Sequence, residues 1–393
     1  MYSQHYFDYN ATTPCAKEVV DAMLPYFYDH FGNPSSSSHP YGWLAKSAVE
    51  DATRDIAKSL EVSAKDLIYT SGATESINMI LKGVCRKYKS KGRHLITTKV
   101  EHKAVLDTCA FLEEEGFEIT YLEVGTQGHI DLEQLKNALR VDTVLASILY
   151  ANNETGVIQP MDEIAALAKA NGTLLFSDMT QALGKIPVKP VLDQIDFACF
   201  SGHKVYGPKG IGLVYAKNNA EGNVLPSFIQ GGRQQRGQRG GTINTPCIVG
   251  LAKAIALTND NLQEEIIRLT TLRNQLEKGL LGIPHTKSNS TTHQRLPNTS
   301  NISFDFVDGE NLLNALSKQL AVSNGSACNS ASVSPSHVLR AMGVAPSLAH
   351  ASLRFSLGRN TTEKDVVKAI AFVTEVVAKQ REENILWERR GSK

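Results

Sequence analysis

The clearest periodic pattern of apolar residues in this chain lies between Gly42 and Leu60. Its apolar positions recur at every fourth residue, at Leu44, Ala48, Ala52, Ile56 and Leu60. Residues at this spacing share one face of a helix, so the pattern predicts a helix with a single buried stripe. Longer helical patterns run over residues 247–280 and 363–379.

Short apolar runs follow this helix, and helical patterns separate most of them. Strands are expected over residues 67–70, 95–98, 117–122, 143–149, 173–177, 195–200 and 211–215. Helices are expected up to residue 87 and over residues 101–115, 132–139 and 162–170. This alternation predicts an α/β fold with a mostly parallel seven-stranded sheet covered by helices on both faces. In such sheets, ligands bind at the carboxyl ends of the strands.

The chain beyond the helical pattern at 247–280 predicts a second, smaller α+β domain. Residues 281–300 are polar and turn-rich, which indicates a loop. After this loop we expect strand 301–306, helix 310–318, a loop that holds Cys328, helix 336–342, strand 353–356 and helix 363–379. We therefore expect a large domain of residues 15–258 and a small domain formed by residues 1–14 with 259–393.

Composition and charge narrow the classes of function. The 393 residues contain 41 Lys and Arg against 40 Asp and Glu, so we expect no direct binding of nucleic acid and no membrane association. No apolar run approaches the length of a transmembrane helix, and the start of the chain does not resemble a signal or transit peptide. The six cysteines form no CxxC pair, so neither a zinc site nor a disulfide framework is predicted, and a reducing cytoplasm fits best.

Lys204 follows the expected strand 195–200, with Ser201 and His203 just before it and a Gly-Pro turn soon after. Lysine is costly to bury, so a lysine delivered from a strand end into a turn suggests a chemical reason. One interpretation is a Schiff-base lysine that holds an aldehyde cofactor, with Ser201 and His203 as polar contacts. The alternative is a surface loop whose lysine is solvated.

Two other strand ends carry groups that suit such a cofactor. Asp178 ends strand 173–177, where a carboxylate needs a partner such as a pyridinium nitrogen, and Gln181 is placed to reach the phenolic oxygen of the same ring. Residues 71–76 join a strand to a helix, where backbone N–H groups and the Thr74 hydroxyl can cradle a phosphate. Helix capping by Asp178 or by Thr74 is the alternative in each case.

Four further residues are candidates for chemistry. His102 stands at a strand-to-helix junction, where an imidazole can stack on a ring and move protons, although a lone histidine is more often structural. Asn153 closely follows strand 143–149 and suits either a ligand contact or a turn. Cys328 lies among small polar residues, which is the setting of a reactive thiol or of an incidental cysteine. Arg354 lies inside an apolar strand and needs an anion, either a structural carboxylate or that of a substrate.

Residues 231–242 form a basic loop rich in glycine. The loop lacks aromatic residues that would stack on bases, which argues against RNA binding. Thr242, at the end of the loop, is instead placed to reach a phosphate, across a dimer interface.

Taken in this order, the motifs resemble those of the cysteine desulfurases, in the class V aminotransferase group of the fold-type I pyridoxal phosphate (PLP) enzymes. The resemblance rests on residues 8–14, 71–76, 101–105, 152–154, 201–204, 325–328 and 354–356, and it extends through the last expected helix. The segment around Cys328 is similar to that of the housekeeping iron–sulfur branch.

The resemblance implies that Lys204 carries PLP as a Schiff base and that Asp178 pairs with the pyridine nitrogen. The other PLP contacts that it implies are His102, Asn153 and Gln181 at the ring, and Ala73, Thr74, Ser201, His203 and, from the second subunit of a homodimer, Thr242 at the phosphate.

The resemblance also implies the substrate and the reaction. Arg354, with Asn153, holds the carboxylate of L-cysteine, and Cys328 accepts the sulfur as a persulfide while L-alanine leaves. Lys204 takes the proton from the substrate Cα, and His102 acts as an acid–base group. The sulfur then passes to an acceptor protein, either an iron–sulfur scaffold or a relay protein of tRNA thiolation.

Four positions depart from the family pattern. Met179, Arg233, Gln235 and Gly240 stand where a small residue, glycine, glutamate and serine are usual. A selenocysteine lyase or an aminotransferase of the same fold would keep Lys204 and Asp178 but would not need Cys328. A catalytically silent scaffold protein would not need all five of Lys204, Asp178, His102, Cys328 and Arg354 together.

Overall fold

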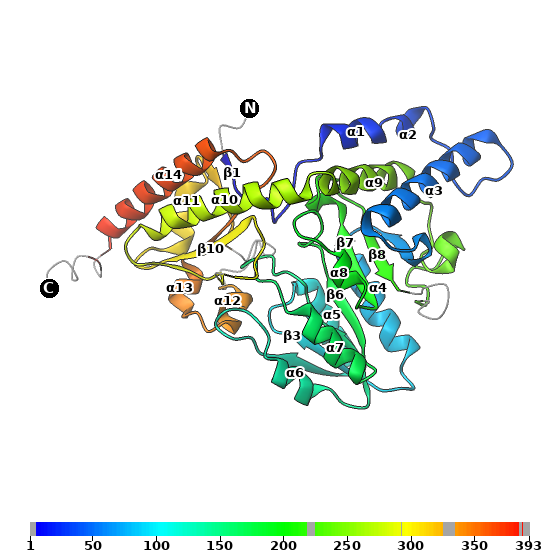
Figure 1. Cartoon of the computed structure of the whole chain (residues 1–393), viewed down its shortest axis with the longest axis horizontal. Coiled ribbons are helices and arrows are strands. Elements are labelled where there is room, and N and C mark those ends of the chain that lie inside the picture. The colour runs from blue at the N-terminus through cyan, green and yellow to red at the C-terminus, as the bar shows by residue number, and fades with distance from the viewer. Residues whose placement is uncertain (1–4, 218–224, 292, 325–334, 385–386, 388–393) are drawn as a thin grey trace.

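The computed structural model describes residues 5–217, 225–291, 293–324, 335–384 and 387. These residues form two bodies, each built on its own sheet, and helices α9 (Thr245–Asn259) and α10 (Leu262–Leu281) run from one body to the other (Figure 1). No helix within these ranges combines the length and the apolar character that crossing a bilayer requires.

The larger body contains a seven-stranded sheet in the order β2-β8-β7-β6-β5-β3-β4. Its strands are β2 (Leu67–Thr70), β3 (His94–Thr98), β4 (Glu118–Leu122), β5 (Thr143–Ser147), β6 (Leu174–Asp178), β7 (Phe197–Ser201) and β8 (Gly212–Ala216). Neighbouring strands are parallel except where β8 pairs with β2 and β7. The predicted mostly parallel α/β sheet is confirmed.

Helices cover both faces of this sheet, because successive side chains of its strands point to opposite sides. Phe176 and Phe197 pack in one hydrophobic cluster with α4 and α5, whereas Leu175 and Ala198 pack in another with α3, α7 and α9. The helices of this body before α9 are α1 (Lys17–Met23), α2 (Pro25–Tyr28), α3 (Pro40–Leu60), α4 (Ala73–Lys87), α5 (Lys103–Glu114), α6 (Leu132–Ala138), α7 (Met161–Ala170) and α8 (Lys189–Leu192).

The smaller body packs α10 and later helices on an antiparallel sheet in the order β12-β10-β9, with its own hydrophobic cluster (Figure 1). The start of the chain joins this body, since β1 pairs with β11 and Phe7 packs in the cluster. The boundary predicted at residue 258 stays a prediction. The remaining elements are β1 (His5–Tyr6), β9 (Thr286–Ser288), β10 (Thr299–Phe304), β11 (Leu320–Ala321), β12 (Ser352–Ser356), α11 (Gly309–Leu316), α12 (His337–Ala341), α13 (Pro346–His350) and α14 (Glu363–Glu382).

Three local predictions are wrong. The pattern at 247–280 forms two helices, because the polar residues Asp260 and Asn261 separate α9 from α10. Part of the predicted loop 281–300 is the strand β9, whose sequence Thr-Lys-Ser contains no apolar run to reveal it. The hydrophobic pattern also misses α1, α2, α8 and α13, since helices of 7, 4, 4 and 5 residues complete too few turns to show a clear period.

Candidate active site

Five strands of the large sheet end at one cavity, which we call the cofactor cavity. Residues at or just beyond the carboxyl ends of β2, β3, β5, β6 and β7 line it, and its volume is ≈ 590 Å³. Thr242 is exposed and is not among the lining residues, and Cys328 lies outside the described residues. The other ten predicted site residues do line the cavity: Ala73, Thr74, His102, Asn153, Asp178, Gln181, Ser201, His203, Lys204 and Arg354.

Lys204 ends a short 3-10 turn that directly follows β7. The turn is tight, since a Cβ at Gly202 would lie 2.7 Å from the Ile211 side chain and 2.9 Å from the Pro208 carbonyl oxygen. The Lys204 Nζ donates hydrogen bonds to the carbonyl oxygens of Asn10 (2.5 Å) and Ala11 (2.8 Å). The amine is therefore held inside the cavity, so the alternative of a solvated surface lysine is wrong.

Asp178 is the last residue of β6. Its Oδ1 accepts a hydrogen bond from the backbone N–H of Thr180 (2.9 Å) and lies 3.5 Å from the Cys199 thiol that donates to it. Turns rather than a helix follow Asp178, so the helix-capping alternative is wrong. Within the described chain, Oδ1 is the oxygen of this carboxylate that accepts hydrogen bonds. The other oxygen, Oδ2, is therefore available to a protonated ring nitrogen.

The start of α4 suits an anion such as a phosphate group. Gly72 precedes the helix and no side chain caps it, so the capping role considered for Thr74 is wrong. The first N–H groups of a helix have no partner within it, and an uncapped N-terminus attracts anions. Close packing against β8 positions this turn, because a Cβ at Gly212 would lie 2.6 Å from the Gly72 backbone.

His203 lies near the same turn and is anchored to the entry segment. Its Nδ1 lies 3.1 Å from the Thr12 Oγ1. Burial lowers the pKa of His203 to about 4, with further contributions from the positive charges of Lys204, Lys209 and Lys185. Without a bound anion, the imidazole is therefore neutral at pH 7, and the surrounding lysines make this side of the cavity electropositive.

His102 immediately precedes α5, and its Nδ1 accepts a hydrogen bond from the Ala104 N–H (3.1 Å). An acceptor nitrogen carries no proton, so the ring proton of the neutral imidazole lies on Nε2. The preceding Glu101 is buried, and its Oε1 accepts from Thr98 Oγ1 (3.0 Å) and the Leu149 N–H (2.9 Å). Burial raises the pKa of Glu101 to about 8.

Arg354 extends from β12 of the smaller body into the cofactor cavity. Its Nη2 donates to Asp8 Oδ1 (2.7 Å) and its Nη1 donates to the Asn153 carbonyl oxygen (3.1 Å). Its Nε is buried and has no hydrogen-bond partner in the described part of the chain. The structural carboxylate that the sequence left open is thus Asp8, and the guanidinium that it holds lines the cofactor cavity.

The loop of residues 231–242 packs against the wall of the cofactor cavity. Gln235 accepts from the Tyr69 N–H (2.5 Å) and donates to the Tyr69 carbonyl oxygen (2.7 Å), so it pairs with the edge strand β2. A glutamate cannot donate, which gives the departure from the family residue a physical reason. Arg239 forms an ion pair with Glu75 (2.9 Å), which lines the cavity.

Sequence reasoning missed Asn10, Ala11 and Asp8 as parts of the site, although their segment belongs to the resembling motifs. Asn10 and Ala11 act through backbone carbonyls, which residue type does not reveal. Asp8 is recognisable only by its contact with Arg354, which lies 346 positions away along the chain.

Comparison with known proteins places the chain in a family. The model of the aminotransferase class V family matches residues 5–368. Proteins named cysteine desulfurase IscS from Anaeromyxobacter sp. (strain Fw109-5) and from Neisseria meningitidis serogroup C are each 47% identical, over 98% of this chain and 95% and 94% of their own lengths.

Solved structures agree with this relationship. A NifS-like protein superposes with a TM-score of 0.89 at 37% identity, over 95% of this chain and 99% of its own. The structure of SspA in complex with cysteine gives a TM-score of 0.78 at 36% identity, over 90% of this chain and 98% of its own. With the lysine, aspartate and arginine assembled at the strand ends as above, this chain belongs to the class V aminotransferase family of PLP-dependent enzymes, in its cysteine desulfurase group.

Proposed function

We propose that this chain converts L-cysteine to L-alanine and leaves the sulfur of its substrate as a persulfide on Cys328. The observation that carries the proposal is the meeting of Lys204, Asp178 and Arg354 at one cavity. These side chains supply an amine for the cofactor aldehyde, a carboxylate for its ring nitrogen and a guanidinium for the substrate carboxylate. The relatives named cysteine desulfurase support this choice among PLP reactions.

The residues of the cofactor cavity fit PLP. When bound, PLP supplies an electron sink that makes the Cα proton of an attached amino acid acidic. Lys204 would hold its aldehyde carbon, and Asp178 Oδ2 would keep the ring nitrogen protonated. The other contacts would be His102, Asn153 and Gln181 at the ring and Ala73, Thr74, Ser201 and His203 at the phosphate.

Two backbone carbonyls prepare Lys204 for proton transfer. A neutral Lys204 amine takes the Cα proton of the substrate, and the Asn10 and Ala11 oxygens stabilise the ammonium that results. His102 presents its Nε2 to the cavity as a second proton carrier, because its Nδ1 is engaged by the Ala104 N–H.

Arg354 and Cys328 act at the two ends of the substrate. The Arg354 guanidinium binds the carboxylate of L-cysteine, while Asp8 and the Asn153 carbonyl hold the guanidinium plane in place. The Cys328 thiolate forms a bond to the substrate sulfur as the bond from that sulfur to Cβ breaks. The products are L-alanine and a Cys328 persulfide, so no external oxidant or reductant is consumed.

Partners and compartment follow from the chemistry of the persulfide. The proposed acceptor is a protein thiol, on an iron–sulfur scaffold or on a relay protein of tRNA thiolation, and neither nucleic acid nor a membrane takes part directly. We place the enzyme in the cytoplasm, where a reducing environment keeps the Cys328 thiol available. We further propose a homodimer in which Thr242 reaches the phosphate site of the second subunit.

Alanine and sulfide release from L-cysteine with a reductant tests the proposal. We expect activity in the wild type and a loss of more than about 100-fold in both Lys204→Ala and Cys328→Ala, because each removes a reacting group. The control is Cys15→Ala, which removes an exposed thiol outside the cofactor cavity and keeps the activity.

Two outcomes would overturn parts of the proposal. Full turnover by Cys328→Ala would indicate a lyase that acts on the substrate without a protein persulfide. Full turnover by Lys204→Ala would show that the reactive lysine lies elsewhere.

A further inference from the structure

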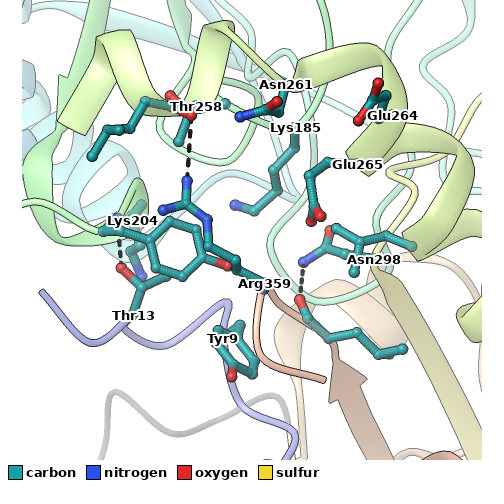
Figure 2. A pocket seen from close by; sticks show the side chains of 15 residues that line it. Tyr9, Thr13, Lys185, Lys204, Thr258, Asn261, Glu264, Glu265, Asn298 and Arg359 are labelled. Atoms are coloured by element: carbon teal, nitrogen blue, oxygen red, sulfur yellow. Dashed lines mark hydrogen bonds between the residues drawn. The ribbon is translucent and has the colours of Figure 1, made fainter. Parts of the chain in front are cut away.

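A second cavity, which we call the rear cavity, also includes Lys204 in its lining (Figure 2). Its volume is ≈ 240 Å³, and residues of α9, α10 and the entry segment line it. Lys204 lines both the rear cavity and the cofactor cavity. Figure 2 shows a second lysine, Lys185, reaching into the rear cavity between Arg359 and Glu265.

Lys185 is a buried lysine to which the proposed reaction assigns no role. Its residue is 8% exposed, and no ion pair with a carboxylate of the described residues balances it. Burial, together with the positive charges of Lys204 and Arg354, lowers its pKa to about 7. A lysine in this setting is costly and needs a compensating contact.

That contact is Gln181, which lines the cofactor cavity. The Lys185 Nζ donates to Gln181 Oε1 (2.8 Å) and to the Gln181 carbonyl oxygen (3.2 Å). The Gln181 Nε2 donates to the Asn10 carbonyl oxygen (2.9 Å), the same oxygen that accepts from Lys204. A hydrogen-bonded chain therefore links Lys185, Gln181, Asn10 and Lys204.

The two partners of Gln181 select one orientation of its amide. A carbonyl oxygen only accepts, so Asn10 requires Nε2 on its side, and the ammonium form of Lys185 only donates, so it requires Oε1. The amide nitrogen has two N–H groups, and the Asn10 bond uses one of them. The second N–H remains for an acceptor in the cofactor cavity.

We propose that Lys185 is a positioning residue that fixes Gln181 as a hydrogen-bond donor toward the phenolic oxygen of bound PLP. The inference rests on the proposed placement of PLP at Lys204. A donor at this oxygen stabilises its negative charge and so disfavours a proton on the nearby Lys204 linkage. Lys185 thereby shifts the protonation of the cofactor linkage without touching the cofactor.

Other charged or titratable groups surround Lys185, and each stays in place in the variants proposed below. These groups are Tyr9, His203, Lys204, Tyr206, Glu264, Glu265, Arg354 and Arg359.

The test is a pH titration of the visible absorption of PLP bound to the full-length holoenzyme, with PLP affinity measured by equilibrium dialysis. Lys185→Met keeps the length of the stem but removes the donor and the charge. We expect the pH at the midpoint of this titration to rise by about one unit in Lys185→Met. We expect the affinity of this variant for PLP to fall about 10-fold. Lys185→Arg restores both values toward the wild type, because the rear cavity has room for the larger head group and the donor is kept.

A double-mutant cycle with Gln181→Leu shows whether Lys185 acts through Gln181. When Gln181→Leu is already present, adding Lys185→Met is expected to change the midpoint pH and the PLP affinity only slightly. A full additional shift in that background, or an unchanged midpoint in Lys185→Met, overturns the proposal. If Lys185→Met does not fold, Lys185→Gln is measured in the same cycle and judged by the same criteria.

The experiment distinguishes a failure of this proposal from a failure of the proposed function. A wild type that binds no PLP at Lys204 would refute the placement of the cofactor. A wild type with normal absorption and a Lys185→Met variant identical to it would refute only the role of Lys185.

Discussion

Glu101 illustrates how one buried carboxyl beside the active site couples stability to pH. Its Oε1 is hydrogen-bonded, whereas its Oε2 is buried without a partner in the described residues. Burial raises the pKa of Glu101 from 4.5 to about 8, so the folded protein retains this proton at neutral pH. An unfolded chain releases it near its ordinary value.

The consequence is a pH-dependent loss of stability that Glu101→Gln removes. Between pH 4.5 and about 8 the folded state binds more protons at this site than the unfolded state, so the free energy of unfolding falls as pH rises. The contribution lost by pH 8 is on the order of 4 kcal/mol. We expect the melting temperature of Glu101→Gln to decline less between pH 5 and 8 than that of the wild type.

The exposed carboxylate of Glu133 provides the matched control for this measurement. Glu133→Gln should keep the wild-type pH dependence. Parallel melting curves for Glu101→Gln and wild type across this range would contradict a buried, protonated Glu101.

The roles of some residues of the site can be predicted from the sequence, whereas those of others cannot. Lys204, Asp178 and Arg354 stand out in the sequence because a charged side chain in or beside an apolar strand needs a partner. Lys185 gives no such signal, since it follows a turn and its burial comes from α9 and α10 packing over it. Asp8 was equally hidden, because its partner Arg354 belongs to the other end of the chain.

At the scale of elements, the cofactor cavity depends on how closely α4 approaches the sheet. Gly212 at the start of β8 lies against the turn that precedes α4, and a Cβ there would meet the Gly72 backbone at 2.6 Å and Thr70 Oγ1 at 2.7 Å. Backbone atoms cannot yield as a flexible side chain does, so a larger residue must displace the helix start.

Gly212→Ala is therefore expected to weaken PLP binding by about 10-fold or more and to lower the melting temperature by several degrees, at a cost of about 1–3 kcal/mol. Equilibrium dialysis with PLP and thermal denaturation measure the two effects. The control is Gly83→Ala within α4, where the new Cβ meets Leu225 at an ordinary 3.4 Å and alanine favours the helix. Wild-type PLP affinity in Gly212→Ala would show that this close packing does not position the anion site.

Prediction of the elements succeeded where apolar runs were long enough to show a period. The strands of the large sheet and the helices α3, α4 and α14 follow from local patterns of this kind. The strand β9 did not follow, because its pairing with β10 rather than an apolar run defines it. The polar residues between α9 and α10 did mark a break, which the long helical pattern concealed.

At the scale of the whole molecule, an apolar surface over α1, α2 and the start of α3 lacks a covering element within the described chain. Its exposed members are Leu24, Phe27, Tyr28, Phe31, Tyr41, Trp43 and Leu44, with Phe27 59% and Phe31 63% exposed. Several large apolar side chains exposed on neighbouring elements are typical of an interaction surface. A second copy of the chain is the occupant that the proposed homodimer supplies.

Light scattering of the purified protein tests this arrangement. We expect twice the mass of one chain in the wild type and a shift toward the monomer in the double variant Phe27→Glu and Phe31→Glu, because two charges would be buried at the interface. Val141→Glu, at a 92% exposed apolar residue outside the patch, should leave the dimer intact. A monomeric wild type, or a dimer that survives both glutamates, would exclude this surface as the interface.

Local sequence was sufficient for the strand-helix alternation, the parallel sheet and most of the reactive side chains. Hydrophobic period and residue type act over a few neighbouring positions, so they can be recognised without knowing the fold. The contacts that complete the site are of another kind: the carbonyls of Asn10 and Ala11 on Lys204, Asp8 on Arg354 and Lys185 on Gln181. Apart from the last, these contacts join segments more than 190 positions apart, and only the packing of the chain brings their atoms within hydrogen-bond distance. Even the Lys185 contact, four positions from Gln181, becomes significant only because tertiary packing removes water from the ammonium group.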